Sequence, residues 1–522
     1  MHDLIYDLAQ LIAGEEYTIL YPDGENIVGR TRHVAFHSSN SLPDIPALLL
    51  KANKMRTVLL RIPILPRLDD ELNVNNDILE SNKPVSDTLI SSFKYLRQLR
   101  ALNLSRSNIQ KVPNFIGKLE HLRFLDLSRN EDIKLLPASI TKLQNLQTLR
   151  LDYCRGLKEL PGDTRNLISL RHLRLDGCKS LTHMPHGLGK LTALQTLSLY
   201  ILGKKKSSLS KPMGGLGDLD GLNQLRGVLR IKGLKHSRSS PSEAKAANLE
   251  RKQHLQWVIL EWDLESGDES DKAIANDEQL NCPMMSLTTP TSSSPLSDLS
   301  KLKYLYLVEL EELEYLPQEW LQNLTSLETL GIWNCRKMRI SMSALFQHLT
   351  SLENRSILGC KELISNENED GTHGLGPTRF GHLSIVDIPN LVSLPRELSD
   401  VTTLQGLQIM VCPSLVSLPE WIGNFTSLQE LGVVNCPNLM SLPEGMHRLT
   451  SLRRLTIAEC PCLEERCEQG MGEDWPKIAH APNFRKGGDG NLKEWIASRA
   501  RQYLEEAFKV SRMDASSDLA DN

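Results

Sequence analysis

Residues 120–143 read EHLRFLDLSRNEDIKLLPASITKL, and the two stretches that follow repeat this pattern at the same length. They are QNLQTLRLDYCRGLKELPGDTRNL at 144–167 and ISLRHLRLDGCKSLTHMPHGLGKL at 168–191. The pattern returns from residue 402 as TTLQGLQIMVCPSLVSLPEWIGNF, TSLQELGVVNCPNLMSLPEGMHRL and TSLRRLTIAECPCL. Each copy contains L-x-x-L-x-L-x-x-C/N, followed by an apolar residue and then by a Leu-Pro pair.

This period is the signature of a leucine-rich repeat. The L-x-L alternation predicts a short strand with one buried face, and the proline after it ends regular pairing because it has no N–H to donate. One copy cannot bury its own leucines, whereas stacked copies bury a continuous column. The sequence therefore predicts an α/β solenoid. This is a leucine-rich-repeat horseshoe with a curved parallel β-sheet on its concave face, a short helical N-terminal piece and a C-terminal amphipathic helix.

The period also predicts how the 522 residues divide. We expect a helical piece at 1–25, a capping region at 26–90 containing the strand-like runs RHVAFHS and MRTVLL, and a first block of repeats at 91–262. An acidic and then Ser/Thr/Pro-rich stretch at 263–300 predicts a mobile loop. A second block of repeats follows at 301–484, with a shorter loop at 365–380. Residues 485–522 hold the predicted helix and a disordered tail.

The spacing of the cysteines matches the repeat. Cys154 and Cys178 are one period apart, as are Cys412, Cys436 and Cys460. This places each thiol at the same point of successive coils, as a small core residue, and it argues against a disulfide or metal site. In the weaker middle copies Arg355 occupies a core leucine position. That predicts either a distorted coil or an arginine whose head reaches solvent.

The composition offers little support for other classes of function. The net charge of −4 does not suggest a nucleic acid or an anionic membrane as partner. We expect no membrane span, no metal and a cytoplasmic location. The sequence has no G-x-x-x-x-G-K-[ST], G-x-S-x-G or H-E-x-x-H motif. An enzyme is therefore not expected.

The variable positions of the strands predict a protein-binding concave face, because their side chains form rows across the coils. The first block is charged and the second is aromatic and apolar, which suggests two contact surfaces of different chemistry. The charged rows could instead be pairs between adjacent strands, and the aromatic residues could merely cover neighbouring coils. The candidate residues are Asp126, Arg150, Asp152, His172, Arg174, Asp176, Tyr304, Tyr306, Trp333, Met410 and Val434.

Several phrases together resemble plant intracellular nucleotide-binding leucine-rich-repeat disease resistance proteins of the coiled-coil class. MHDLIYDLA resembles the end of their nucleotide-binding module, and TRHVAFHS and KANKMRTVLL resemble the opening of their repeats. LRALNLSRSNIQKVPNFIGKLEHLRFLDLS, AANLERKQHLQWVILEWD and CPCLEERCEQGMGEDWPKIAHAP resemble their first repeats, a phrase within the array and its closing phrase. The resemblance covers residues 1 to about 484.

The resemblance implies pathogen sensing, in which the repeats bind an effector or a guarded host protein and regulate a nucleotide-binding module. It implies that His2 and Asp3 belong to an ADP-sensing motif, and that residues 1–25 are a remnant of that module. The phosphate loop of the family does not occur in this sequence, so we expect no cofactor in this chain and a motif that is not functional here. The alternatives are a regulatory scaffold acting in trans on a related resistance protein, and a general adaptor.

Overall fold

The computed structural model describes the chain in ten stretches, which fall into two compact units, Met1–Leu225 (unit 1) and Arg226–Asn522 (unit 2). The described residues are 16–20, 30–36, 54–60, 87–203, 213–236, 247–262, 300–310, 313–316, 318–364 and 380–486.

Unit 1 carries a parallel sheet in which β1 to β8 lie side by side in chain order. Its central strand positions are occupied by a leucine column that is at most 2 % exposed. The column runs through Leu102, Leu125, Leu149, Leu173 and Leu197. The strands are β1 (Tyr17–Leu20), β2 (His33–Phe36), β3 (Thr57–Leu60), β4 (Ala101–Asn103), β5 (Phe124–Asp126), β6 (Thr148–Arg150), β7 (His172–Arg174) and β8 (Thr196–Leu197), and β9 (Leu199–Ile201) follows them.

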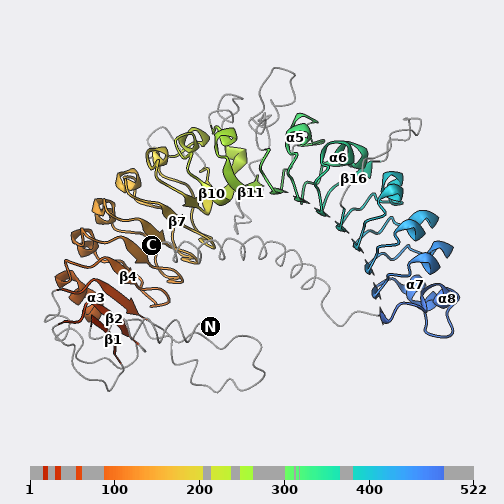
Figure 1. The fold of residues 1–522 in the computed structure, drawn as a ribbon, viewed down its shortest axis with the longest axis horizontal. Coiled ribbons are helices and arrows are strands. Elements are labelled where there is room, and N and C mark those ends of the chain that lie inside the picture. Colours follow the sequence, from red (N-terminus) through yellow and green to blue (C-terminus); the bar gives the residue numbers. More distant parts are fainter. Residues whose placement is uncertain are drawn as a thin grey trace, which may run out of the picture. The chain divides into compact units, whose positions relative to one another are not determined.

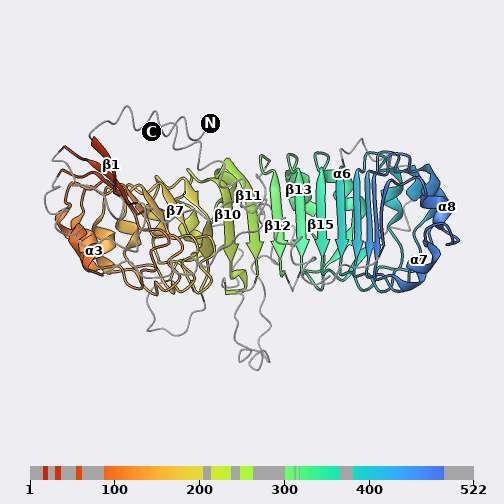
Figure 2. The same cartoon turned by 90° about the horizontal axis from the view of Figure 1, so that it is seen from below.

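Unit 2 repeats this arrangement with longer strands, and Figure 2 shows them side by side. From β10 onward every sheet neighbour is parallel. The strands are β10 (Arg226–Lys232), β11 (His254–Glu261), β12 (Tyr304–Val308), β13 (Thr329–Trp333), β15 (Asn354–Leu358), β17 (His382–Val386), β18 (Gly406–Met410), β19 (Glu430–Val434), β20 (Arg454–Ala458) and β21 (Asn483–Lys486). A small pair, β14 (Arg339–Ser341) and β16 (Glu362–Ile364), lies apart from this sheet. The predicted leucine-rich-repeat solenoid is confirmed.

The return segments of the coils are short helices, which lie on the opposite side of each unit from its strands (Figure 1). Five 3₁₀ helices begin directly after a proline, which follows leucine in four coils and Val112 in the first, and the missing N–H costs no hydrogen bond there. They span Asn114–Lys118, Ala138–Lys142, Arg396–Asp400, Glu420–Asn424 and Glu444–Arg448. The α-helices are α3 (Asp87–Ser92), α5 (Gln318–Asn323), α6 (Met342–His348), α7 (Pro461–Arg466) and α8 (Trp475–Ile478).

The cysteine ladder lies where the period predicts. The Cys154 thiol donates to the carbonyl of Leu127 at 3.2 Å, and the Cys178 thiol donates to that of Leu151 at 3.1 Å. In an earlier coil Asn130 fills this place, with its amide donating to the Leu104 carbonyl at 2.8 Å. Each side chain thus satisfies a backbone carbonyl of the preceding coil. Burial raises the pKa of the Cys154 thiol to about 12, so the neutral form that donates is the stable one.

The residue before each ladder position turns the chain in the left-handed region. Gly177 and Asn435 have φ of 72° and 51°, which glycine tolerates because it has no Cβ and asparagine because its short polar side chain can hydrogen-bond locally. Val411 occupies the same place with φ of 55°, an uncommon conformation for a β-branched residue. This coil therefore contains local backbone strain that the sequence pattern alone does not reveal.

Side-chain caps end the strands of unit 1 early. The Ser105 N–H bonds to Oδ1 of Asn103, and the Ser128 N–H bonds to Oδ1 of Asp126, both at 2.9 Å. These side chains compete with the ladder for the backbone donor two residues on. The capped strands β4 and β5 have three residues each, as do β6 and β7, whereas β12, β13 and β15 have five.

Arg355 contradicts both expectations for its coil. The strand β15 keeps regular register with β13 and β17, which places Arg355 between the core positions of Leu330 and Leu383. Its side chain does not reach solvent, because the residue is 3 % exposed. The guanidinium lies 4.6 Å from the ring centres of Phe346 and Phe380. Two aromatic faces therefore replace water around this cation.

A buried carboxylate anchors the closing segment of unit 2. Asp474 is fully buried and accepts bonds from the Leu442 N–H at 2.9 Å and from two nitrogens of Arg466 at 3.1 and 3.2 Å. The ammonium of Lys477 lies 2.9 Å from Oδ1 of Asp474. Although burial alone would raise its pKa, these donors hold the pKa of Asp474 below its usual value. The phrase GEDWPKIAH thus ties α7 and α8 to the last repeats.

The N-terminal runs predicted as strands are β2 and β3, whereas no strand is predicted for β1. The helical piece predicted at 1–25 is wrong at Tyr17–Leu20, which form the strand β1, and its residues 1–15 and 21–25 lie outside the described residues. The stretches 263–299 and 365–379, predicted as loops, also lie outside them. So do the C-terminal amphipathic helix and the tail. Among the described residues, no helix is long and apolar enough to cross a membrane.

Candidate protein-binding surface

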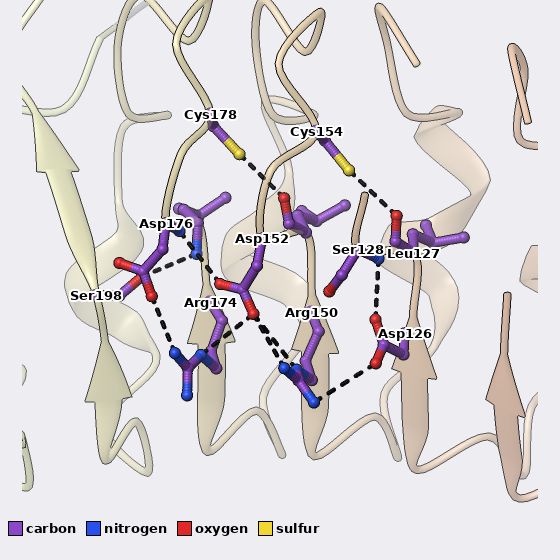
Figure 3. A network of polar contacts seen from close by, with 12 residues as sticks. Asp126, Leu127, Ser128, Arg150, Asp152, Cys154, Arg174, Asp176, Cys178 and Ser198 are labelled. Atoms are coloured by element: carbon purple, nitrogen blue, oxygen red, sulfur yellow. Dashed lines mark hydrogen bonds and ion pairs between the residues drawn. The ribbon is translucent and has the colours of Figure 1, made fainter. Parts of the chain in front are cut away.

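The charged residues of unit 1 lie in rows on the sheet face opposite the leucine core, which we call the concave face. Asp126, Arg150 and Arg174 occupy equivalent positions of β5, β6 and β7. Asp152 and Asp176 follow two residues after the arginines. Figure 3 shows the five side chains as one connected network. The predicted alignment of these residues across coils is confirmed.

Ion pairs join each strand of the network to the next. Arg150 lies 3.5 Å from Asp126 and 3.3 Å from Asp152, and Arg174 lies 3.3 Å from Asp152 and 3.0 Å from Asp176. All members except Arg150 are less than one-tenth exposed, whereas the Arg150 side chain is 39 % exposed. The charged rows are therefore pairs between adjacent strands, which is the alternative that the sequence left open.

The network is also tied to the backbone. Oδ1 of Asp152 accepts the Asp176 N–H at 3.2 Å, and Oγ of Ser198 accepts the Leu175 N–H at 2.8 Å. Burial, followed by the nearby Asp152 charge, raises the pKa of Asp176. Burial opposes the charge of Arg174, yet the two carboxylates raise its pKa. Three carboxylates share two guanidinium groups, so Arg174 is essential to the charge balance of this face.

His172, the remaining candidate of unit 1, begins β7 beside this network. Its Nδ1 lies 3.1 Å from Oγ1 of Thr196 on the neighbouring strand. An equivalent contact joins His33 to Thr57 at 2.9 Å. The histidine therefore pairs across strands.

The aromatic candidates of unit 2 belong to a stack across β11, β12 and β13. Trp257 stacks on Tyr304 with ring centres 3.7 Å apart, and Tyr306 lies 5.0 Å from Trp333. Tyr306 and Trp333 are each 4 % exposed, and the indole N–H of Trp333 donates to Oγ of Ser356 at 3.1 Å. These two rings thus pack against neighbouring coils, which is the alternative that the sequence left open for the aromatic residues. Tyr304 is half-buried.

Sequence reasoning missed Trp257 as a member of this cluster. Its signal is the alternation within LQWVILEW, which puts Trp257 and Ile259 on the same face as Tyr304 and Tyr306. The indole nitrogen of Trp257 is buried without a hydrogen-bond partner. Beside the cluster Glu261 forms ion pairs with Arg230 and with Lys232, the latter at 3.0 Å.

Met410 and Val434 lie in an apolar row at the ends of β17 to β20. With Val386 and Ala458 they form a cluster in which each residue is 3–6 % exposed. The same row in unit 1 carries Asp152 and Asp176. The two units therefore present a charged row and an apolar row at the same place in the coil.

The remaining predicted sites concern nucleotide and metal. His2 and Asp3 lie outside the described residues. No group of three or more His, Cys, Asp or Glu side chains with the proximity of metal ligands occurs in the described part of the chain.

The geometry agrees with comparisons to known proteins. The family model "R13L1/DRL21 LRRs" matches residues 216–360, and the model "Leucine rich repeat" matches residues 78–131. Over 275 residues the chain is 41 % identical to the putative disease resistance protein RGA1 of Solanum bulbocastanum, covering 51 % of this chain and 25 % of that protein. Over 140 residues it is 33 % identical to the putative disease resistance RPP13-like protein 1 of Arabidopsis thaliana, covering 26 % of this chain and 12 % of that one.

Solved structures that are similar to this chain include a Leptospira interrogans LRR protein, with 19 % identity, a TM-score of 0.48 and coverage of 86 % of this chain and 94 % of that chain. The plant peptide hormone receptor RGFR1 in complex with RGF2 has 15 % identity, a TM-score of 0.41 and coverage of 91 % of this chain and 80 % of that chain. The chain spans a quarter or less of the disease resistance relatives it matches. It is a leucine-rich-repeat protein related to plant disease resistance proteins.

Proposed function

We propose that this chain is a recognition part of plant defence, and that its concave face binds a pathogen effector or a guarded host protein. In this role the bound partner alters the signalling state of a nucleotide-binding module. The function rests on binding alone and includes no catalytic step.

The observation that carries the proposal is that each concave surface holds a partly exposed side chain in a fixed position. Arg150 of unit 1 is held by Asp126 and Asp152 on either side. Tyr304 of unit 2 is held by its stack on Trp257. Arginine and tyrosine are frequent binding hot spots, and a side chain that is already ordered loses little entropy when a partner binds.

The proposal places the chain in the cytoplasm without a cofactor of its own. The ladder thiols Cys154 and Cys178 donate hydrogen bonds as free thiols, which a reducing compartment preserves. The sequence lacks the phosphate-loop pattern, so we expect calorimetry of this chain to show no binding of ADP or ATP. Binding at low micromolar affinity would contradict this part of the proposal.

Affinity capture from infected and uninfected plant tissue tests the binding function. The wild-type chain is compared with Arg150→Gln and Tyr304→Ala, which alter the exposed groups of each surface. Matched controls are Arg155→Gln, an exposed arginine paired with Glu131, and Tyr315→Ala, a tyrosine that is 49 % exposed in a return segment. Tyr306 and Trp333 are left intact because truncating buried rings would disturb the fold.

We expect at least one concave variant to lose a partner that both controls retain, with an affinity loss of about tenfold or more. A partner from infected tissue only indicates an effector, and one from both tissues indicates a guarded host protein. Capture of nothing but the nucleotide-binding module of a related protein would favour the scaffold acting in trans. If every variant recovers the same partners as wild type, these side chains do not form the binding surface.

A further inference from the structure

Unit 1 carries a strongly basic surface where each return segment leads into its strand. The five stretches concerned read YLRQLR at 95–100, KLEHLR at 118–123, KLQNLQ at 142–147, NLISLR at 166–171 and KLTALQ at 190–195. They hold seven exposed cations against one carboxylate, that of Glu120, and therefore a net charge of +6. We call this surface the basic edge. Its cations are Arg97, Arg100, Lys118, Arg123, Lys142, Arg171 and Lys190.

The backbone holds one row of the basic edge in register at the start of the strands. The Arg100 N–H donates to the Arg56 carbonyl, and the Arg123 N–H donates to the Arg100 carbonyl, both at 2.7 Å. Two further bonds of 2.8 Å continue this ladder through Gln147 to Arg171. The arginines of successive coils therefore lie side by side at the same edge of the sheet.

A second row lies at the ends of the return helices. Lys118, Lys142 and Lys190 are the last residues of three 3₁₀ helices. Two apolar side chains accompany these lysines, because Tyr95 is 51 % exposed and Ile168 is 60 % exposed. Of the three exposed large hydrophobic side chains among the described residues of unit 1, these two lie on the basic edge. The edge is thus a band of two cationic rows with apolar side chains in it.

Unit 2 shows that the coil does not require these charges. Its equivalent stretches at 323–328, 348–353, 400–405, 424–429 and 448–453 carry two cations and three carboxylates. The same backbone ladder is present there, with the Glu353 N–H donating to the Glu328 carbonyl at 2.8 Å. Helix C-termini favour cations, yet the return helix Arg396–Asp400 ends in a carboxylate. The charge of the basic edge is therefore not explained by the fold.

The cations of the basic edge keep their charge available to a partner. Within the part of the chain that the structure describes, no carboxylate forms an ion pair with any of the seven. The net charge of −4 conceals this surface, because most carboxylates of the chain lie outside these five stretches. Arg150 and Tyr304, which carry the proposed binding function of the concave face, are not part of the edge.

We propose that the basic edge binds the surface of an anionic lipid membrane. Guanidinium and ammonium groups donate to the phosphate and carboxylate oxygens of lipid headgroups, and clusters of about four to eight Lys and Arg are typical of such surfaces. Tyr95 and Ile168 suit the apolar part of the headgroup region. These two side chains would gain nothing against the phosphates of a duplex nucleic acid, and an acidic peptide would follow one row only. The width of the edge and its apolar side chains therefore favour a membrane.

Sedimentation of the full chain with lipid vesicles tests the proposal. Wild type should bind vesicles of phosphatidylcholine with about one-third phosphatidylserine, and should not bind phosphatidylcholine alone. Each cation at an anionic surface strengthens binding about fivefold, so Arg100→Gln/Arg123→Gln should bind about 25-fold more weakly. The matched control Arg129→Gln/Arg155→Gln removes the same charge beyond the other ends of the strands and should stay within about threefold of wild type. All four arginines are exposed, so an unchanged Tm checks that the variants remain folded.

A second pair of variants leaves the charge unchanged. Tyr95→Ser/Ile168→Ser should weaken vesicle binding by at least about threefold, whereas Leu135→Ser, at an exposed leucine outside the basic edge, should not. An unchanged affinity of Tyr95→Ser/Ile168→Ser would overturn the proposal, because any polyanion would then satisfy the edge.

Three further outcomes would also overturn it. Wild type does not bind the anionic vesicles, or Arg100→Gln/Arg123→Gln binds them no more weakly than its control does. In the third, a duplex DNA or an acidic helical peptide binds the edge more tightly than the vesicles, which identifies another polyanion as the partner. None of these outcomes depends on capture of a protein by the concave face.

Discussion

Replacing Arg355 by methionine should stabilise unit 2, although it removes a charged side chain from an intact strand. None of the three guanidinium nitrogens of Arg355 has a hydrogen-bond partner, and the residue lies between Phe346 and Phe380. Methionine keeps the unbranched stem between the rings and allows sulfur–aromatic contacts. Exchanging buried ions for hydrophobic residues of similar volume is often stabilising.

The magnitude follows from the pKa of Arg355. Burial lowers this pKa to about 9, and each pKa unit below the usual value of arginine corresponds to about 1.4 kcal/mol, so the buried charge costs about 5 kcal/mol. Two desolvated cation–π contacts return about 2 to 4 kcal/mol. The net penalty is about 1 to 3 kcal/mol. We therefore expect the Tm of unit 2 to rise by about 2 to 6 °C at pH 7.5.

The pH dependence gives an independent check. Below pH 9 Arg355 is protonated in both the folded and the unfolded state, so the full penalty applies. As pH rises through the lowered pKa of Arg355, the folded state loses the proton before the unfolded state does, which relieves the penalty in wild type. The cation–π contacts hold the proton on Arg355, so the advantage of Arg355→Met should begin to shrink only above about pH 10 and should be smaller at pH 11 than at pH 7.5.

Thermal unfolding followed by calorimetry at the two pH values measures both effects. Arg355→Leu, which copies Leu330 and Leu383, should behave in the same direction. Arg336→Met is the control, because it removes an exposed arginine from a neighbouring coil and should leave the Tm unchanged. A lower Tm for Arg355→Met at pH 7.5, or an advantage that does not change with pH, would refute the reasoning.

Three further substitutions test features of the fold by thermal unfolding. Asp474→Asn should lower the stability of unit 2 by about 2 to 3 kcal/mol. The difference in stability between wild type and this variant should vanish as pH falls through the depressed pKa of Asp474. The control Glu473→Gln, which changes a side chain that is 74 % exposed, should have little effect. Arg174→Met should destabilise unit 1 by about 3 kcal/mol because it removes the ion pair of the buried Asp176 and leaves Asp152 with Arg150 alone, and the exposed Arg171→Met serves as its control. Val411→Asn should stabilise unit 2 by about 0.5 to 1 kcal/mol by relieving left-handed strain, and an unchanged or lower Tm would count against that strain.

The period predicts everything that depends on position within one coil. It places Leu149 and Leu173 in the core, aligns Arg150 with Arg174, and gives Cys154 and Cys178 equivalent partners. These features require only that the spacing of side chains match the spacing of coils, so they follow from the sequence without knowledge of the packing.

Features that depend on packing between coils do not follow from the period. The alternation shows that Trp333 and Tyr306 share a face, but their burial comes from rings on neighbouring strands. The surroundings of Arg355 depend on Phe346 in a helix and on Phe380 beyond the next loop. Neither is adjacent to Arg355 in the repeat frame, so the sequence predicts either a distorted coil or an arginine that reaches solvent, whereas the structure holds a regular coil with a buried arginine.

The charge network of unit 1 limits how its repeats can be exchanged by recombination. A coil carrying Arg174 and Asp176 is stable only beside a coil that supplies Asp152 in matching register, so swapping that coil alone would leave buried charges unmatched. The apolar row through Met410 and Val434 imposes no such pairing, because one aliphatic neighbour can replace another at modest cost. We therefore expect natural or engineered shuffling to move the coils of unit 2 singly and those around β5 to β7 only as a block.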